Sequence, residues 1–250
     1  MSKGLILPRI IGHRGACGYA PENTLESIKT AAEMGVKWVE IDVMLTKDMV
    51  PVIFHDDTLE RTTNGAGNMA DTLYKDLVDL DAGSWFSDGF ATSKIPTLEE
   101  AIDVILKYDL GLNLEIKPTA GREVATAEAA LDILSRIWDD PDKLLISSFQ
   151  HVSLETAKDM APEWKRGMLI DEPLKNWQEL AEYLDVATIN IDGRDQSLTR
   201  EAVEAYIETG RGVLAYTIND PMRARTLFSW GVDGVFTDVP DMIEGVVTRH

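Results

Sequence analysis

Eight short apolar runs alternate with helical patterns along the 250 residues, and this alternation predicts a (β/α)8 barrel of the TIM type. The chain length suits one such barrel, and a hydrophobic fraction of 44% is enough for a sizeable core. A doubly wound open sheet is the alternative, because periodicity alone does not show that a sheet closes. We therefore expect a single catalytic domain over residues 1–250.

The predicted strands are short runs rich in β-branched and other apolar residues, separated by turn and helix signals. They cover residues 10–13, 38–45, 112–117, 144–149, 167–170, 186–191, 213–219 and 234–237. A short extension over residues 51–55 follows the second strand and ends at His55.

Helix starts between these strands are predicted from capping residues. Asn23 with Glu26 resembles a capping box, and so does Thr97 with Glu100. Asp220-Pro221 places a cap before a proline in the first turn, which is a favoured position for proline.

Residues 56–95 interrupt the alternation after the second strand. The segment contains turn formers at 64–68, and then an amphipathic piece with leucines at positions 73, 77 and 80. It is too long and too apolar for a plain loop, so we expect a small insertion folded over one end of the barrel.

Two carboxylates separated by one residue lie on the second predicted strand. Because strand side chains alternate between faces, Glu40 and Asp42 point to the same side. Glu115 and Lys117 share a face of the third strand in the same way. Buried carboxylates need partners. An ordinary salt bridge at a sheet edge is one solution, and a divalent cation is the simplest one for all three acids. Their hard oxygen ligands suit Mg²⁺ or Ca²⁺ rather than a thiophilic metal.

The candidate functional residues cluster at the carboxyl ends of predicted strands, where barrel active sites form. His13 and Arg14 end the first strand, and His55 ends the extension after the second. Arg14 offers a planar fork for phosphate oxygens, and Lys117 offers a point charge. Two imidazoles can share proton transfer, one toward and one away from a reacting group. The set suits metal-assisted cleavage of a phosphodiester.

The balance of 24 basic against 43 acidic residues gives a net charge of −19, which disfavours binding to nucleic acid and to anionic membranes. Cys17 is the only cysteine, so no disulfide forms within the chain. No apolar run approaches the length of a membrane span, and the N-terminal apolar run is too short for a secretion signal. We predict a cytoplasmic protein that acts on a small molecule.

Six motifs, in order along the chain, resemble those of the glycerophosphodiester phosphodiesterase family. They are His13-Arg14-Gly15-Ala16-Cys17-Gly18-Tyr19-Ala20-Pro21-Glu22-Asn23-Thr24, Glu40-Ile41-Asp42-Val43, His55-Asp56-Asp57-Thr58-Leu59-Glu60-Arg61-Thr62-Thr63, Ile95-Pro96-Thr97-Leu98-Glu99-Glu100, Leu114-Glu115-Ile116-Lys117, and Gly231-Val232-Asp233-Gly234-Val235-Phe236-Thr237-Asp238-Val239-Pro240. Together they span nearly the whole chain.

This resemblance implies a barrel with an insertion after the second strand and one divalent metal ion. It implies that the metal is held by Glu40, Asp42 and Glu115, and that His13 and His55 are the acid–base pair. It also implies that Arg14 and Lys117 bind the phosphate. The implied reaction releases an alcohol and glycerol 3-phosphate, with either water or the glycerol 2-hydroxyl as the nucleophile.

Two departures from the family pattern concern the substrate pocket. Cys17 replaces a small hydroxyl residue, and we expect a small buried side chain there rather than a reactive thiol. Tyr216, in Tyr216-Thr217-Ile218-Asn219, replaces a more familiar tryptophan. Tyr216 and Phe149 are possible pocket residues, with core packing as the alternative for both.

Two other functions compete with this prediction. One is a phospholipase D-like hydrolysis of lysophospholipids on a related barrel. The other is a non-catalytic barrel that binds phosphoesters. The binding barrel would be marked by the loss of one histidine or acid, and none is missing.

Overall fold

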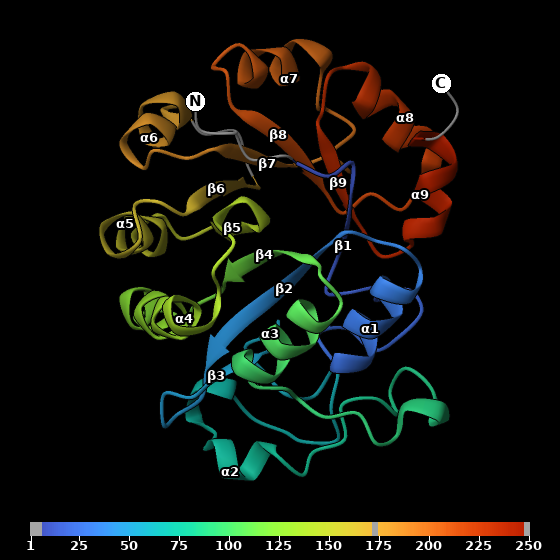
Figure 1. Cartoon of the computed structure of the whole chain (residues 1–250), viewed down its shortest axis with the longest axis vertical. Helices are drawn as coiled ribbons and strands as arrows, with labels where there is room; N and C mark the ends of the chain where they lie inside the picture. Colours follow the sequence, from blue (N-terminus) through green and yellow to red (C-terminus); the bar gives the residue numbers. More distant parts are fainter. Residues whose placement is uncertain (1–6, 172–174, 248–250) are drawn as a thin grey trace.

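Eight parallel strands close into a barrel in the computed structural model, which describes residues 7–171 and 175–247 (Figure 1). The strands are β1 (Ile10–Gly12), β2 (Trp38–Leu45), β4 (Gly111–Ile116), β5 (Leu144–Ser148), β6 (Lys165–Ile170), β7 (Thr188–Asp192), β8 (Gly212–Tyr216) and β9 (Gly234–Thr237). The order runs β1-β9-β8-β7-β6-β5-β4-β2, and pairing of Gly12 with Val39 joins β1 to β2. The predicted barrel is therefore confirmed, and the open sheet is excluded.

Helices surround the barrel and connect its strands (Figure 1). They are α1 (Leu25–Glu33), α3 (Leu98–Lys107), α4 (Glu123–Ile137), α5 (His151–Met160), α6 (Trp177–Tyr183), α7 (Arg200–Ile207), α8 (Pro221–Ser229) and α9 (Pro240–Val247), with a 3₁₀ turn at Pro141–Lys143 before β5. Within the described ranges, no helix has both the length and the apolar character needed to span a membrane.

The caps of these helices confirm two of the three predicted starts. Thr97 and Glu100 form a reciprocal capping box on α3, and the Asp220 side chain accepts from the backbone N–H of Met222 at the start of α8. The box predicted for α1 is wrong. Thr24 is the N-cap of α1, and its hydroxyl accepts from the backbone N–H of Ser27. Asn23 is instead turned toward the barrel.

Side chains along β2 alternate between the core that faces the helices and the barrel interior, where the site lies. Val39, Ile41 and Val43 pack outward into the layer between strands and helices, together with residues of α1, α3 and α4. Trp38 points into the barrel, where it packs with Ile11, Leu145, Leu214 and Phe236. Glu40 and Asp42 follow Trp38 at every second position of the strand, so their side chains also point inward.

Gly111 allows Trp38 to fill the barrel interior. A Cβ at position 111 would lie only 2.2 Å from the Trp38 ring. The close approach of ring and backbone therefore requires glycine, and it provides a packed base for the residues that follow on β2 and β4.

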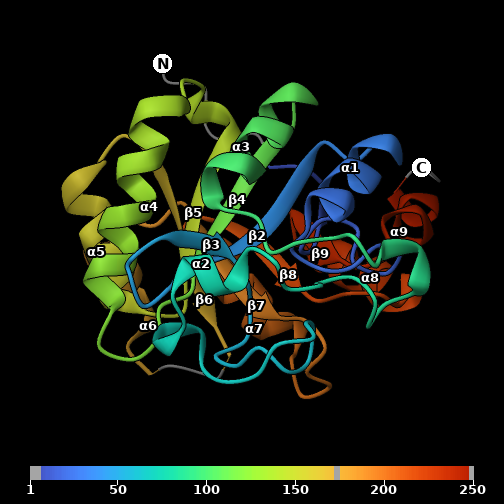
Figure 2. The same cartoon turned by 90° about the horizontal axis from the view of Figure 1, so that it is seen from below.

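The segment after β2 has a small core of its own. Strand β3 (Pro51–Ile53) pairs antiparallel with the end of β2, and is followed by a 3₁₀ turn at Met69–Asp71, by α2 (Tyr74–Leu77) and by a 3₁₀ turn at Asp88–Phe90. Its apolar cluster is Met44, Val52, Phe54, Leu59, Met69, Leu77, Ala82 and Ile95. Because Met44 lies near the carboxyl end of β2, the segment packs beside that end of the barrel (Figure 2).

Candidate active site

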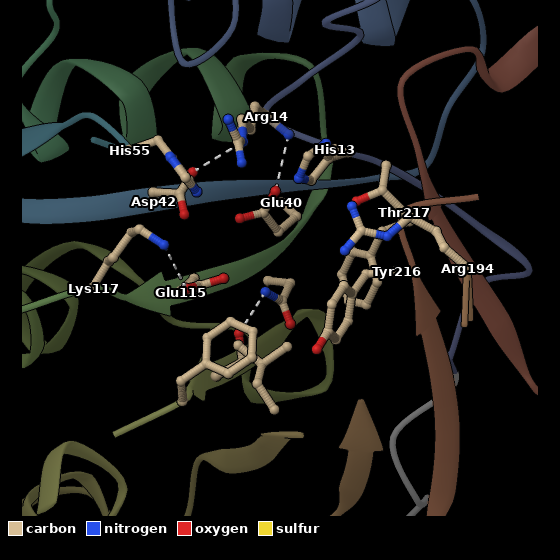
Figure 3. A pocket seen from close by; sticks show the side chains of 15 residues that line it. His13, Arg14, Glu40, Asp42, His55, Glu115, Lys117, Arg194, Tyr216 and Thr217 are labelled. Atoms are coloured by element: carbon tan, nitrogen blue, oxygen red, sulfur yellow. Dashed lines mark hydrogen bonds and ion pairs between the residues drawn. The ribbon is translucent and has the colours of Figure 1, made fainter. Parts of the chain in front are cut away.

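All nine predicted site residues line one cavity of about 340 Å³ at the carboxyl ends of the strands (Figure 3). They are His13, Arg14, Glu40, Asp42, His55, Glu115, Lys117, Phe149 and Tyr216. The structure thus brings them together, while their individual roles stay predictions.

Glu40, Asp42 and Glu115 form a compact acidic cluster in the cavity. The ligand oxygens of the three residues lie within 4.8 Å of one another, and Asp42 pairs in register with Glu115. One oxygen of Glu40 and one of Glu115, Oε1 in each case, are buried without a hydrogen-bond partner. A divalent cation would satisfy both oxygens, so the residues present fit such an ion.

The charge state of the cluster reflects its burial. Desolvation and the neighbouring Asp42 carboxylate raise the pKa of Glu115 to about 8. The same causes raise the pKa of Glu40 well above its ordinary value. Without a cation, the site therefore favours bound protons on these two glutamates.

Asp42 differs from its two neighbours in the direction of its pKa shift. Burial opposes its charge, but the positive charges of Arg14, His55 and Lys117 together with the Asn23 hydrogen bond outweigh burial and lower the pKa of Asp42. Asn23 Nδ2 donates to Asp42 Oδ2 at 2.8 Å, and Asn23 Oδ1 accepts from the Asp42 backbone N–H at 3.2 Å. The left-handed backbone of Asn23, with φ 57°, allows this turn into the barrel.

Arg14 connects the acidic cluster to the loop before α1. Its backbone N–H donates to Glu40 Oε2 at 2.9 Å, and its Nη1 donates to Glu22 Oε1 at 2.6 Å. Its Nε lies 3.5 Å from Asp42 Oδ2 (Figure 3). Burial disfavours the charge, but Asp42 and Glu22 raise the pKa of Arg14 overall. Arg14 therefore stays a fixed cation in the cavity wall.

Lys117 supplies the second positive charge. It follows β4, and its Nζ lies 3.6 Å from Glu115 Oε1 (Figure 3). Lys117 and Arg14 thus supply the local positive charge that an anionic substrate needs in this acidic protein.

His13 is held by a carboxylate from the last strand of the barrel. Asp238, just after β9, lies with Oδ1 2.7 Å from His13 Nδ1. An ionised carboxylate only accepts hydrogen bonds, so Nδ1 of His13 carries a proton. The other ring nitrogen, Nε2, takes no part in this hydrogen bond. Burial opposes ionisation of Asp238, but its hydrogen bond with His13 lowers the Asp238 pKa overall.

His55 has a matching partner in the next residue. Its Nδ1 lies 2.6 Å from Asp56 Oδ1, and Arg61 binds the same carboxylate through Nε and Nη2 at 2.5 and 2.9 Å. Arg61 continues to Glu22, with two hydrogen bonds of 2.7 Å. Burial lowers the pKa of His55, against the attraction of Asp42.

Cys17 lies beside His13 and is only partly buried, contrary to the small buried side chain that was expected. His13, Cys17 and Asp238 also bring ligand atoms within 4.8 Å of one another. These three side chains differ from the acidic cluster because they already bond to one another. The Cys17 thiol and His13 both donate to Asp238. Burial and Asp238 raise the pKa of the Cys17 thiol, so a reactive thiolate is disfavoured.

An aromatic wall faces the acidic cluster across the cavity. The rings of Phe149 and Tyr216 meet edge to face with centroids 5.8 Å apart, and the Tyr216 hydroxyl donates to the Ile170 carbonyl at 2.8 Å. Arg194 lies at this wall, where its Nη2 pairs with Asp192 Oδ2 at 2.7 Å (Figure 3).

Sequence reasoning gave several polar residues no role in the site, although it placed one of them, Asn23, in a helix cap. They are Glu22, Asn23, Asp56, Arg61, Arg194 and Asp238. Asp56 and Asp238 stand at the ends of extended runs, as the predicted site residues do. This position at the end of an extended run was the feature of the sequence that could have identified them as site residues. Glu22 and Arg61 lie in two of the motifs that resemble the family, but nothing in the sequence indicates that they pair, because their pairing depends on how the insertion folds.

Comparisons with known proteins identify the family of the chain. Residues 13–242 match the glycerophosphoryl diester phosphodiesterase family. A glycerophosphodiester phosphodiesterase from Caldanaerobacter subterraneus subsp. tengcongensis is 33% identical over 240 residues, covering 96% of this chain and 98% of the relative. One from Bacillus subtilis is 31% identical over 256 residues, covering 94% and 85%.

A solved structure shows the same fold at higher identity. It is a phosphodiesterase from Oleispira antarctica in complex with the product sn-glycerol-3-phosphate. It is 45% identical, has a TM-score of 0.93, and the match covers 96% of this chain and 97% of that one. The chain therefore belongs to the glycerophosphoryl diester phosphodiesterase family.

Proposed function

We propose that the chain hydrolyses glycerophosphodiesters to glycerol 3-phosphate and an alcohol, using one bound Mg²⁺ or Ca²⁺. One observation carries the proposal. A single cavity holds three clustered acids, two imidazoles and three cationic side chains, and the Oε1 atoms of Glu40 and Glu115 are buried without a hydrogen bond. The family relationship and the product bound to the Oleispira relative support the choice of substrate class.

Glu40, Asp42 and Glu115 would hold the cation. When bound, the cation neutralises phosphate charge and polarises a phosphoryl oxygen. Asn23 and Arg14 position Asp42, and the backbone N–H of Arg14 positions Glu40. Arg14 and Lys117 add positive charge beside the phosphate, which stabilises the negative charge that develops as the diester is attacked.

His13 and His55 share the proton transfer. Each imidazole has a carboxylate on Nδ1, so Nε2 is the nitrogen that exchanges protons with the substrate. One imidazole takes the proton of the nucleophile and the other gives one to the departing alcohol oxygen. The nucleophile is either water or the glycerol 2-hydroxyl, and the second route passes through a cyclic phosphate.

A substrate panel tests the proposed reaction. We expect release of glycerol 3-phosphate from glycerophosphocholine and similar diesters, loss of this release with a chelator, and its return on adding Mg²⁺ or Ca²⁺. Faster cleavage of a lysophospholipid would favour the phospholipase D-like alternative. Tight binding of a diester without turnover at any cation concentration would favour the binding barrel. Detection of a cyclic glycerophosphate would separate the two nucleophiles.

Asp238→Asn is expected to lower kcat by about 10²-fold or more, with little change in KM. Asn219 Nδ2 donates to Asp238 Oδ2 at 2.5 Å, so the amide oxygen of the variant would face Asn219. The amide N–H would then face His13 Nδ1 and favour a proton on Nε2, the wrong tautomer for a base. Steady-state kinetics across pH would measure the loss and any shift of the profile.

Asp241→Asn is the matched control for this variant. It removes the same charge three residues later, at an exposed side chain that accepts from the Tyr19 hydroxyl. Its kinetics should match those of the unaltered chain. Equal kinetics for Asp238→Asn and Asp241→Asn would contradict a positioning role for Asp238.

We also propose that the chain acts as one catalytic domain, with residues 56–95 as an insertion in it. Hydrogen bonds from Arg61 to Glu22 and contacts of the insertion with Met44 support this arrangement. A cytoplasmic location stays a prediction and rests on the single cysteine.

A further inference from the structure

A second group of metal-ligating side chains shares no residue with the acidic cluster. It consists of His13, Cys17 and Asp238, and one ligand atom of each lies within 4.8 Å of the other two. The fold brings these distant positions together, because β1 pairs with β9 and the backbone N–H of Gly18 donates to the Asp238 carbonyl at 2.9 Å. We call this group the His–Cys–Asp cluster.

The donor atoms of the His–Cys–Asp cluster favour a different class of metal from those of the acidic cluster. The acidic cluster offers only carboxylate oxygens, which suit Mg²⁺ or Ca²⁺. The His–Cys–Asp cluster offers one nitrogen, one sulfur and one oxygen, a set that suits Zn²⁺ or Co²⁺. Cys17 is the only cysteine of the chain, so the sulfur ligand exists at this place alone.

The distances within the His–Cys–Asp cluster are close to those of a metal site. Ligand atoms of a tetrahedral zinc site lie about 3.3–3.6 Å apart, as its bond lengths require. Cys17 Sγ lies 3.8 Å from His13 Nδ1, whereas Asp238 Oδ1 lies 2.9 Å from the sulfur and 2.7 Å from the nitrogen. A shift of the carboxylate oxygen by less than about 1 Å would therefore complete the geometry.

Asp238 is already oriented for such a role. Asn219 Nδ2 donates to Asp238 Oδ2 at 2.5 Å, and Asn219 Oδ1 accepts from the Asp238 backbone N–H at 2.9 Å. These two hydrogen bonds leave Asp238 Oδ1 to face Cys17 and His13. Partners of this kind, which orient a ligand from outside, are typical of metal sites.

An ion can reach the His–Cys–Asp cluster from solvent. The side chains of His13 and Asp238 are 18% and 27% exposed, and Cys17 is partly exposed. A water molecule can therefore occupy the fourth position of a tetrahedral ion. Without a metal, two protons point at Asp238 Oδ1, one from the thiol and one from Nδ1. A bound Zn²⁺ would replace both: the thiol proton is released, the imidazole proton moves to Nε2, and the occupied cluster is neutral.

We propose that the His–Cys–Asp cluster is an inhibitory site for Zn²⁺ and similar nitrogen- and sulfur-binding cations. With the metal on Nδ1, Nε2 of His13 carries the proton and no longer accepts one from a reacting group. The inhibition rests on the proposed function, whereas the binding of the metal does not. Because Cys17 replaces a small hydroxyl residue of the family pattern, the sulfur ligand would set this chain apart from that pattern.

The first test measures glycerol 3-phosphate release with saturating Mg²⁺ and increasing Zn²⁺. Zn²⁺ at about ten times its Kd should lower the rate of the unaltered chain about tenfold. Cys17→Ser keeps a donor toward Asp238 but lacks the sulfur ligand. It should need about 10²-fold more Zn²⁺ for the same fractional loss, because even a residue that only orients a ligand contributes 10- to 100-fold to affinity. Each rate is compared with that of the same protein without Zn²⁺.

The second test needs neither turnover nor a variant that keeps its activity. Co²⁺ bound to a thiolate absorbs in the near ultraviolet by charge transfer from sulfur, and Co²⁺ bound to carboxylates alone does not. The unaltered chain should show this band on addition of Co²⁺, and Zn²⁺ should remove it. Cys17→Ser should lack the band. Glu115→Gln, the control that impairs only the acidic cluster, should keep it.

Three results would overturn the inference. They are the absence of the cobalt band from the unaltered chain, equal zinc sensitivity of the unaltered chain and Cys17→Ser, and relief of the inhibition by excess Mg²⁺, which would place Zn²⁺ in the acidic cluster. Absence of turnover by the unaltered chain without Zn²⁺ would instead overturn the proposed function and the inhibitory role. The cobalt band would still decide whether the His–Cys–Asp cluster binds a metal.

Discussion

Replacing either His13 or His55 with alanine is expected to lower kcat by about 10²- to 10⁴-fold, with the fold intact. The reason is that each ring lines the cavity with Nδ1 tied to a carboxylate, so that Nε2 remains to exchange protons with the substrate. The side chains are 18% and 27% exposed and belong to none of the apolar clusters, so their removal leaves the packed core in place.

The measurement is the rate of glycerol 3-phosphate release at saturating substrate and cation, together with the midpoint of thermal unfolding. His55→Ala should also lose the acidic or basic limb of the pH profile that His55 contributes. Since the two imidazoles act in one reaction, the double variant should be little slower than the slower single one. Added imidazole should restore part of the activity.

His151→Ala is the matched control for these variants. His151 opens α5 and lies outside the lining of the catalytic cavity, so its removal should leave kcat close to that of the unaltered chain. Full turnover by His13→Ala or His55→Ala would remove that residue from the acid–base pair. An unfolding midpoint well below that of the control would point to a structural loss instead.

The parts of the site that the sequence predicted follow from strand periodicity. A period of two predicts the shared face of Glu40 and Asp42, and β2 places the alternate residues Val39, Ile41 and Val43 in the helix-facing core, as the pattern requires. The position of His13 and Glu115 near the carboxyl ends of barrel strands placed them at one rim, because parallel strands of a barrel end at the same side. His55 reaches this rim for another reason: β3 runs back antiparallel to β2, so that Ile53 pairs with Val43 beside Asp42.

The parts that were missed depend on contacts between distant segments. Asp238 and His13 are 225 positions apart and meet because β9 pairs with β1. Glu22 and Arg61 are 39 positions apart and meet because the insertion packs back toward the loop before α1. Asn23 was assigned to a helix cap, since asparagine is common there, but its side chain holds Asp42.

Glu115→Gln is expected to abolish most activity and most of the stabilisation by cation, without unfolding the protein. The variant keeps the size of the side chain but removes one of three charges from a cluster whose ligand atoms lie within 4.8 Å. The cation loses a charged ligand, so its affinity falls. Because Glu115 without a cation already favours a bound proton, the neutral glutamine resembles it, and the cation-free variant should be about as stable as the unaltered chain.

Thermal unfolding with and without cation measures this directly. At a cation concentration 100-fold above its Kd, the unaltered chain should gain about 2.7 kcal/mol. For a chain of this size, that corresponds to a rise in Tm of about 5–10 °C. Glu115→Gln should show only a small part of this rise at the same concentration. An unchanged titration would remove Glu115 from the ligand set.

The pH dependence of the stability of the cation-free protein is a second test of Glu115. The ordinary pKa of 4.5 rises to about 8 for Glu115 in the folded chain, so the folded state binds more protons than the unfolded state between these values. Stability should therefore fall as pH rises from about 4.5 to about 8. The Gln variant should lose this dependence in part, while Glu99→Gln, at an exposed ion pair on α3, should retain it. The same slope in both variants would show that Glu115 is ionised in the cation-free site.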